Sequence, residues 1–290
     1  MKFQNIIQIP DLALISMKYC TPPDLIKLLV LSREIRSLLL SSIELCSFPL
    51  KLSSPKTNIT VTELEGLLSS SALFQSISSL SLPKCRELTD ESLKFFQYLK
   101  NLTKLSLHGC CQISNSGLVY LVQCSKLVSL DLSYCSKITR LKALSGLYVR
   151  LKTLNLAQCS NLRQVTFSSG CPITTAITTS SLLQNLNLSL CRHINDKRLS
   201  SCLRLLPCLQ VLSINGCSNV TDLGLLSIGD FCPGLTVLDV SWLYQLTLTG
   251  LANSLGQLPC LSEVSMHGIK SHIIDVLRML FPSAIIITDT

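Results

Sequence analysis

One short apolar pattern recurs along this chain and constrains its fold more than any other feature. The pattern sets three leucines and a cysteine at fixed spacing, as in Leu102, Leu105, Leu107 and Cys110. Neighbouring copies are about 25 residues apart, except for one longer step from 154 to 186. A period of this length predicts a stack of similar structural units. The second position of each copy is Leu80, Leu105, Leu130, Leu154, Leu186, Leu212, Leu238 and Val264.

Each unit has room for one strand and one helix. Within Leu-x-Leu the side chains alternate, so both leucines point into the stack and the middle residue points out. The pattern resembles the leucine-rich repeat. That resemblance implies an α/β solenoid, a horseshoe with a parallel sheet on its concave side and helices on its convex side. Each repeat would bury its apolar face only against its neighbours.

Helix start signals follow several strands. Thr221-Asp222 offers an N-cap before an apolar helical pattern, and Thr89-Asp90 and Asn195-Asp196 repeat this signal. The longer step contains a stretch rich in Ser and Thr, with Gly and Pro, over residues 167–181. We expect this stretch to be a loop inserted where a helix would otherwise stand.

Composition excludes two other classes of protein. The chain is 47% apolar and 14% charged, with a mean hydropathy of +0.44, whereas an average domain is about 25% charged. No apolar run approaches the roughly 18 residues of a spanning helix, so we expect no membrane contact. A net charge of +8 over 290 residues is too weak, and the apolar content too high, for a disordered chain.

Cysteine usage indicates a reducing compartment, the cytoplasm or the nucleus. There are 15 cysteines, an odd number, and disulfide frameworks belong mainly to small secreted domains. The amino terminus also lacks the apolar stretch of a secretory signal, because Asp11 interrupts the first candidate.

Six cysteines stand one repeat apart and are expected to form an inward column. Structural zinc is one interpretation, but zinc prefers clustered ligands such as C-x2-C pairs, and the sequence has none. A thiol is also a small hydrophobic group that is often buried. We therefore interpret the column as core and expect no metal or other cofactor. Its members are Cys85, Cys110, Cys135, Cys159, Cys191 and Cys217.

This column, followed by Ile/Val-Thr-Asp, is similar to the cysteine-containing subfamily of leucine-rich repeats. The copy from Cys124 to Thr139 matches best, and the resemblance covers roughly residues 74–290. The usual owners of such repeats are F-box proteins, the substrate receptors of SCF-type (cullin–RING) ubiquitin ligases. The resemblance implies a receptor that binds a protein substrate on its concave face for ubiquitin-dependent proteasomal degradation.

The amino-terminal residues resemble an F-box. The segment 9–12 (IPDL) is similar to its L-P-x-E-L-type opening, and 24–38 is similar to its closing helix, although Ile35 stands where Trp is usual and the middle is about one residue short. The alternative is a helical cap over the first repeat, which a solenoid requires. An F-box would contact a Skp-family adaptor, and through it a cullin complex, with Pro10, Leu25, Leu28 and Leu29.

These patterns divide the chain into three segments. Residues 1–45 form the F-box-like helical segment, and 46–73 form a linker leading into a degenerate first repeat. Residues 74–290 hold about eight repeats, and they end with a helix over 273–280 and a closing strand over 284–287. A repeat protein of the same kind without ligase coupling, a scaffold or an inhibitor, remains the alternative function.

Enzyme signatures are missing from the sequence, since no phosphate-binding loop, nucleophile elbow or HExxH motif occurs. Function should therefore lie on the concave face. Tyr134 and Trp242 lie just past a strand at one repeat position and would anchor a partner, although Trp242 could instead fill the core. The outward strand residues are small and polar: Ser81, Ser106, Asp131, Asn155, Asn187, Ser213, Asp239 and Ser265.

Charge is unevenly distributed. Between residues 132 and 195 there are seven basic residues and no acidic ones. One interpretation is a surface for an acidic or phosphorylated substrate segment, built around Lys142, Arg150 and Lys152; the other is a solvated flank. Nucleic acid is disfavoured because no aromatic residues are interleaved to stack bases. The seven are Lys137, Arg140, Lys142, Arg150, Lys152, Arg163 and Arg192.

Overall fold

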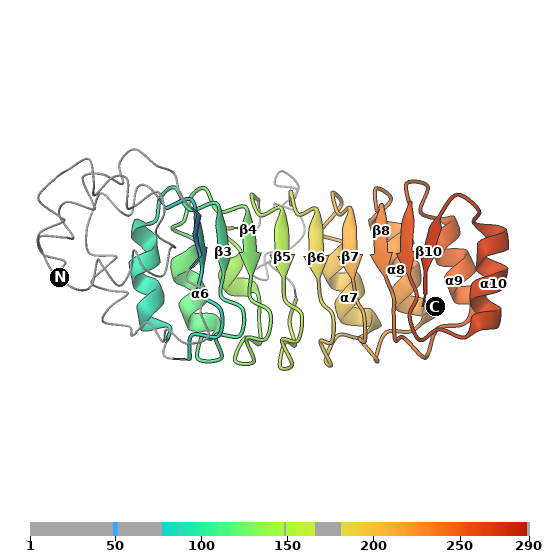
Figure 1. Ribbon diagram of the computed structural model, residues 1–290, viewed down its shortest axis with the longest axis horizontal. Helices are drawn as coiled ribbons and strands as arrows, with labels where there is room; N and C mark the ends of the chain where they lie inside the picture. Colours follow the sequence, from blue (N-terminus) through green and yellow to red (C-terminus); the bar gives the residue numbers. More distant parts are fainter. Residues whose placement is uncertain (1–48, 52–76, 87, 148, 166–180, 289–290) are drawn as a thin grey trace, which may run out of the picture.

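The computed structural model describes residues 49–51, 77–86, 88–147, 149–165 and 181–288. Within these ranges, ten short parallel strands follow one another in sequence order in a single sheet (Figure 1). This arrangement confirms the α/β leucine-rich-repeat solenoid. The strands are β1 (Pro49–Lys51), β2 (Ser79–Ser81), β3 (Lys104–Ser106), β4 (Ser129–Asp131), β5 (Thr153–Asn155), β6 (Asn185–Asn187), β7 (Val211–Ser213), β8 (Val237–Asp239), β9 (Glu263–Ser265) and β10 (Ile285–Ile287).

The repeat pattern sets the register of the sheet. Leu80 lies opposite Leu105, and Leu105 lies opposite Leu130, so the same position of each copy pairs along the stack. These central leucines are buried, as is the apolar residue after each strand, such as Leu107. The first and third strand residues point to the other side of the sheet. We call that side the strand face.

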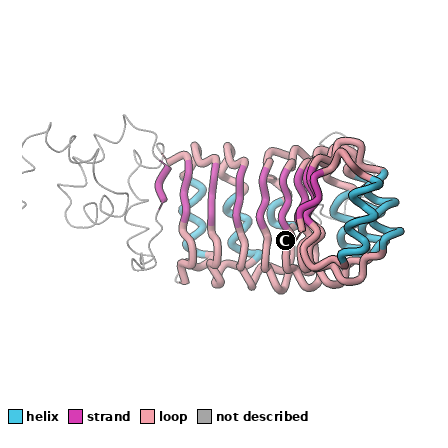
Figure 2. The backbone as a smooth tube through the Cα atoms, turned by 45° about the vertical axis from the view of Figure 1, so that its right-hand side comes forward, coloured by secondary structure: helices cyan, strands magenta, loops and turns pink. Residues whose placement is uncertain are grey.

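Helices form a second layer behind the sheet (Figure 2). Because each helix packs mainly on its neighbours along the stack, the apolar interior is one continuous core between the two layers. Among the described residues, no helix is long and apolar enough to span a membrane. The helices are the 3₁₀ segments η2 (Glu91–Tyr98) and η3 (Lys142–Leu144), and α6 (Asn115–Leu121), α7 (Asp196–Leu203), α8 (Asp222–Phe231), α9 (Leu248–Gly256) and α10 (Ser271–Leu280).

The start signals predicted from the sequence lie at helix ends. The Thr221 hydroxyl accepts a hydrogen bond from the Leu223 N–H at 3.3 Å at the start of α8. The Asn195 side chain accepts one from the Arg198 N–H at 3.1 Å at the start of α7. Asp90 stands at the N-cap of η2, but its side chain makes no capping bond there. The last helix and the closing strand are α10 and β10.

The cysteine column is a hydrogen-bonded ladder inside the core. The Cys110 thiol donates to the Leu82 carbonyl oxygen at 3.0 Å, and the Cys135 thiol donates to the Leu107 carbonyl oxygen at 3.3 Å. The thiols of Cys159, Cys191 and Cys217 repeat this bond at 3.1–3.2 Å. Each thiol therefore fills a small apolar space and satisfies a backbone carbonyl of the preceding repeat.

One member of the column departs from the prediction. Cys85 is half-buried, whereas the other five thiols are fully buried. It belongs to the repeat of β2, the second strand of the described sheet. The described cysteines form no disulfides, and no described group of three His, Cys, Asp or Glu residues is arranged to hold a metal.

The amino-terminal segments are described only in part. β1 pairs in parallel with β2, so the sheet continues into the 46–73 segment. The F-box-like segment, with Pro10, Leu25, Leu28 and Leu29, lies outside the described residues. The expected loop over 167–181 lies outside them too, apart from Ser181.

Candidate functional site: the strand face and a basic cleft

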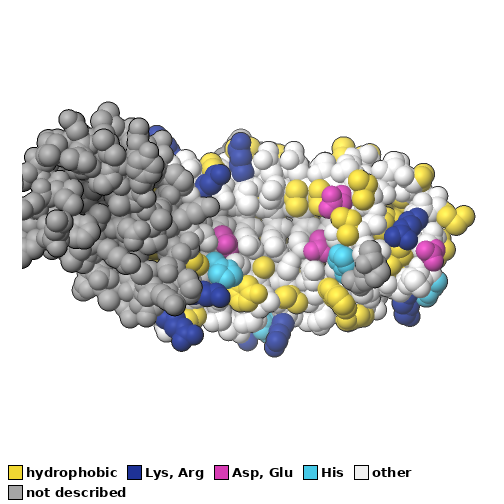
Figure 3. All heavy atoms as spheres, viewed as in Figure 1, with side chains coloured by type: hydrophobic (Ala, Val, Ile, Leu, Met, Phe, Trp, Pro, Cys, Tyr) yellow, Lys and Arg dark blue, Asp and Glu magenta, His cyan; other side chains and the backbone are white. Residues whose placement is uncertain are grey.

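The predicted outward column lies on the strand face. Each of its members is the third residue of its strand and is half-buried. In the view of Figure 3, acidic side chains lie at two places along the middle of the molecule, each near a histidine, and most Lys and Arg side chains lie nearer the edges. The column supplies the two carboxylates of Asp131 and Asp239.

Four members of this column close the turn after their strand. The Asp131 Oδ1 accepts from the Ser133 N–H at 3.0 Å, and the Asp239 Oδ1 accepts from the Ser241 N–H at 3.1 Å. Asn155 and Asn187 bond the N–H two residues on in the same way, at 3.1 and 2.9 Å. These side chains hold the backbone in an Asx turn, so part of their bonding capacity is used within the protein.

The second oxygen of each carboxylate ties neighbouring repeats together. The Ser106 hydroxyl donates to the Asp131 Oδ2 at 3.1 Å, and the Ser213 hydroxyl donates to the Asp239 Oδ2 at 2.8 Å. The face therefore presents ordered carboxylate and hydroxyl groups. Such a surface suits hydrogen-bond donors and cations of a partner better than it suits an acidic segment.

One group on this face superficially resembles a catalytic triad. The His108 Nδ1 lies 2.8 Å from the Ser133 Oγ, and that hydroxyl donates to the Asp131 Oδ1 at 2.6 Å. Because the hydroxyl proton is used on the carboxylate, the His108 ring must donate to Ser133 rather than take its proton. In a nucleophilic triad the histidine stands between the hydroxyl and the carboxylate. The geometry here is that of a structural network.

Tyr134 and Trp242 are exposed at one edge of the strand face. Their side chains are 47% and 44% exposed. The Tyr134 ring packs edge-on against His108 at 4.9 Å, and Trp242 lies 6.3 Å from Tyr244 between ring centroids. Trp242 is thus not a core-filling residue, and both rings are accessible at the surface.

The backbone at these two rings is left-handed. Both residues have a φ of +61°, a left-handed conformation that costs an aromatic residue energy. Glycine occupies the same repeat position at Gly109, Gly216 and Gly268 with φ near +70°. Lys84, Gln158 and Leu190 also occupy this position with positive φ, so the position is not reserved for glycine.

The basic residues singled out from the sequence do not form one surface, which corrects that expectation. Lys142 lies in η3 in the helix layer, and Lys152 lies directly before β5. The Arg150 Nη2 donates to the Val122 carbonyl oxygen at 2.8 Å, so this guanidinium joins two repeats. The three were grouped because they are close in sequence, but strand and helix carry them to different layers.

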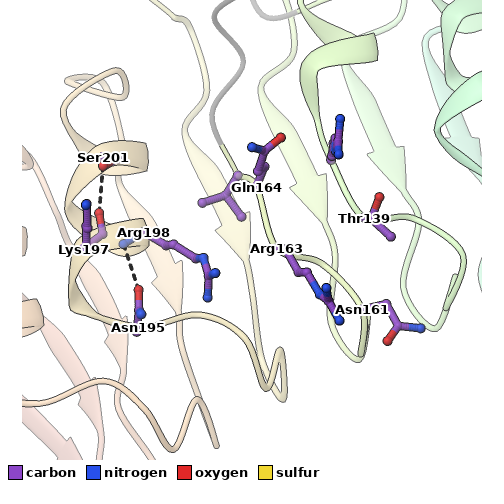
Figure 4. A pocket seen from close by; sticks show the side chains of 10 residues that line it. Thr139, Asn161, Arg163, Gln164, Asn195, Lys197, Arg198 and Ser201 are labelled. Atoms are coloured by element: carbon purple, nitrogen blue, oxygen red, sulfur yellow. Dashed lines mark hydrogen bonds between the residues drawn. The ribbon is translucent and has the colours of Figure 1, made fainter.

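Two other basic residues of that sector line a cleft in the helix layer (Figure 4). The cleft has a volume of about 770 Å³ and lies between the turn after β5 and the start of α7. Arg140 and Arg163 contribute from one side, and Lys197 and Arg198 contribute from α7. The other lining residues are Thr139, Asn161, Gln164, Val165, Asn195 and Ser201.

The cleft coincides with a break in a hydrogen-bonding pattern of the helix layer. We call the fifth residue after each column cysteine the acceptor position. Asp196 and Asp222, at this position, each accept from the N–H and the hydroxyl of the threonine that caps the next helix. Arg140 and Gln164 occupy the acceptor position on the cleft side. Two adjacent repeats therefore lack the carboxylate that Asp196 and Asp222 supply in the next two repeats, whereas Asn115 supplies an amide in the preceding one.

Sequence reasoning missed Lys197 and Arg198, because the basic sector was ended at the first acidic residue, Asp196. The stack shows that Asp196 bonds Thr221 of the next repeat and that the two cations after it face the preceding one. A signal was present in the sequence. It was the replacement of Asp or Asn by Arg140 and Gln164 at the acceptor position.

No protein-family model matches this chain, and no curated protein matches it. Among solved structures it is similar to yeast Rad7 in its complex with Elc1, with 16% identity and a TM-score of 0.46 over 95% of this chain and 86% of that one. It is also similar to internalin C2 of Listeria monocytogenes, with 24% identity and a TM-score of 0.49 over 79% and 92% of the two chains. For the leucine-rich-repeat-containing protein LegL7 of Legionella pneumophila the identity is 18% and the TM-score 0.47, over 83% and 89%. The repeat architecture is established by this chain's own period and register.

Proposed function

We propose that this protein is a non-catalytic substrate-recognition subunit of an SCF-type ubiquitin ligase, acting in the cytoplasm or the nucleus. In this proposal the repeats bind a protein substrate and residues 1–45 bind a Skp-family adaptor. The observation that carries the substrate-binding part is the strand face, with its ordered polar groups and the two exposed aromatic rings of Tyr134 and Trp242. The adaptor-binding part is supported by the F-box-like sequence of residues 1–45 alone.

The strand face has the composition expected of a protein-binding surface. Aromatic side chains supply most of the binding energy at interfaces, and surrounding polar groups supply specificity. Tyr134 and Trp242 lie at the same repeat position, four repeats apart along the stack. A substrate that contacts both rings would therefore cross the polar groups of β4 to β8, including those of Asp131 and Asp239.

Co-expression with a Skp-family adaptor tests the ligase part. The full chain should co-purify with the adaptor, and Leu25→Asp/Leu28→Asp should abolish this, because a buried carboxylate costs several kcal/mol. Lys27→Asp is the matched control, since it adds a carboxylate between these positions at a polar residue of the pattern. Absence of the adaptor from the wild-type preparation, with the repeats folded, would favour the scaffold or inhibitor function instead.

A further inference from the structure

We propose that the cleft between the turn after β5 and α7 binds a phosphorylated segment of a protein partner. This goes beyond the proposed function, because it holds whether or not residues 1–45 bind an adaptor. It also places phosphate recognition in the helix layer (Figure 4). The strand face is less suitable, because the two carboxylates of its column would repel a phosphate.

Charge is the first argument. Arg140, Arg163, Lys197 and Arg198 line the cleft, and none of the lining residues that the structure describes is acidic. None of these four cations forms a salt bridge with a described residue. The carboxylate next in sequence, that of Asp196, is turned to the following repeat, where its two oxygens accept from the Thr221 N–H and hydroxyl, both at 2.8 Å.

The repeat pattern is the second argument. In α8 and α9 the third helical residue is glycine, and a Cβ there would lie 2.5 Å or less from the carboxyl group of the preceding repeat's acceptor residue. In α7 the third residue is Arg198 and the preceding acceptor residue is Gln164. Where α8 and α9 place a glycine beside a carboxylate, α7 therefore places the Arg198 guanidinium beside the uncharged side chain of Gln164. An external anion would supply the negative charge that Asp196 and Asp222 supply in the next two repeats.

Most of these cations are available to a ligand. Arg140, Arg163 and Lys197 are exposed. Arg198 is half-buried, and its Nη1 donates to the His193 carbonyl oxygen at 2.5 Å. This hydrogen bond holds the side chain in place, and the other N–H groups of the guanidinium can bond a ligand. Arginine bonds a phosphate through two parallel N–H groups. A preorganised guanidinium flanked by three exposed cations is well suited to a dianion.

The rest of the lining favours a peptide as the carrier of the phosphate. A volume of about 770 Å³ exceeds what a phosphate needs and leaves room for flanking residues. Asn161, Gln164 and Ser201 offer amide and hydroxyl groups to a peptide backbone. Among the described lining residues none is aromatic, so these residues offer bases nothing to stack on. One phosphate brings a charge of about −1.5 to −2 to one point, which separate carboxylates do not.

Binding of peptide pools to the full chain tests the proposal. The probe is a pool of nine-residue peptides with central phosphoserine and randomised flanks; matched pools carry Ser or Glu at the centre, and a fourth probe is a nine-nucleotide single-stranded DNA. The wild type should retain the phosphoserine pool at least tenfold better than the other three probes. Arg140→Gln/Arg163→Gln/Lys197→Gln should reduce that retention at least tenfold, and it should leave the urea midpoint unchanged because these side chains are exposed.

The control variant is Arg86→Gln/Lys100→Gln/Lys270→Gln, which removes the same net charge from exposed positions in other repeats. It should bind the phosphoserine pool as the wild type does. Equal losses in both variants would mean that only net charge matters, and this would overturn the proposal. So would full retention by the cleft variant, or tighter binding of the DNA than of the phosphoserine pool. Adaptor binding is not measured, so failure of this test leaves the proposed function untouched.

Discussion

At the scale of single residues, the turn after each of the strands β2 to β9 places one residue in the left-handed region. Non-glycine residues with positive φ occur there at Lys84, Tyr134, Gln158, Leu190 and Trp242, and glycines occur in the other repeats. The glycines also make room for a neighbour. A Cβ at Gly268 would lie 2.5 Å from the Trp242 Cε3, because the indole extends over the next repeat.

Gly268→Ala should therefore destabilise the protein by about 1–3 kcal/mol, through left-handed strain and a clash with the indole of Trp242. The control is Gly256→Ala at the end of α9, where a Cβ would meet nothing within 4 Å. Urea unfolding should show a lower midpoint for the first variant and an unchanged or higher one for the second. Equal midpoints would refute this account of the turn.

The column thiols predict a loss of stability at alkaline pH. Burial raises the pKa of Cys135 to about 12, whereas an exposed thiol titrates near 8.5. Between these values the unfolded chain releases a proton that the folded chain keeps. The free energy of unfolding therefore falls by about 1.36 kcal/mol per pH unit for each such thiol. Below about pH 8 the effect vanishes.

Cys135→Ala removes one of these protons. Its stability should fall by about 2 kcal/mol less than that of the wild type between about pH 8 and pH 10. Cys260→Ala, at an exposed cysteine, should leave the pH profile of the wild type unchanged. Denaturant unfolding at a series of pH values measures the difference. Parallel profiles for the wild type and Cys135→Ala would show that this thiol titrates normally.

At the scale of elements, a carboxylate at the start of one helix bonds the capping threonine of the next helix. The same carboxylate lies against a glycine of that next helix. The Asp222 side chain accepts from the Thr247 N–H at 3.0 Å and from its hydroxyl at 2.6 Å. A Cβ on Gly250 would lie 2.0 Å from the Asp222 Cγ. The acid at the start of α8 and the glycine in α9 are therefore a matched pair.

This pairing predicts a strong coupling. Gly250→Ala should destabilise the wild type by about 1–3 kcal/mol, through the clash with Asp222. In the Asp222→Ala background the same change should be neutral or stabilise by up to about 1 kcal/mol, because alanine is the better helix former. Asp230→Ala, at an exposed acid of α8, is the control background and should leave the cost in place. Additive effects of the Asp222 and Gly250 changes would contradict the pairing.

Elements were predictable from the sequence where one repeat encodes them. Strands β2 to β9 follow from the leucine spacing, and the starts of α7 and α8 follow from Asn195 and Thr221, because these signals are local. β1 was not predicted, because it lies in the segment interpreted as a linker. The reduction of the third repeat's helix to η3 was not predicted, because Leu141 and Leu144 look much like residues of a longer helix. The cleft was not predicted either, since its cations come from three repeats and meet only after stacking.

At the scale of the whole molecule, the stack separates possible functions in space. Strands follow one another in sequence order, so each repeat depends on its neighbours, and β1 and β10 lie at opposite ends of the sheet (Figure 1). The strand face and the basic cleft belong to opposite layers. The F-box-like segment precedes the first strand in sequence. In the proposed function an adaptor binds residues 1–45, and a substrate binds the described repeats.

Hydrogen–deuterium exchange of the full chain, with and without a Skp-family adaptor, tests this division of labour most directly. The account predicts slower exchange on adaptor binding for amides within residues 1–45, and unchanged exchange for amides of the strand face and of the cleft. Slower exchange confined to the repeats, or no change anywhere at saturating adaptor, would contradict it.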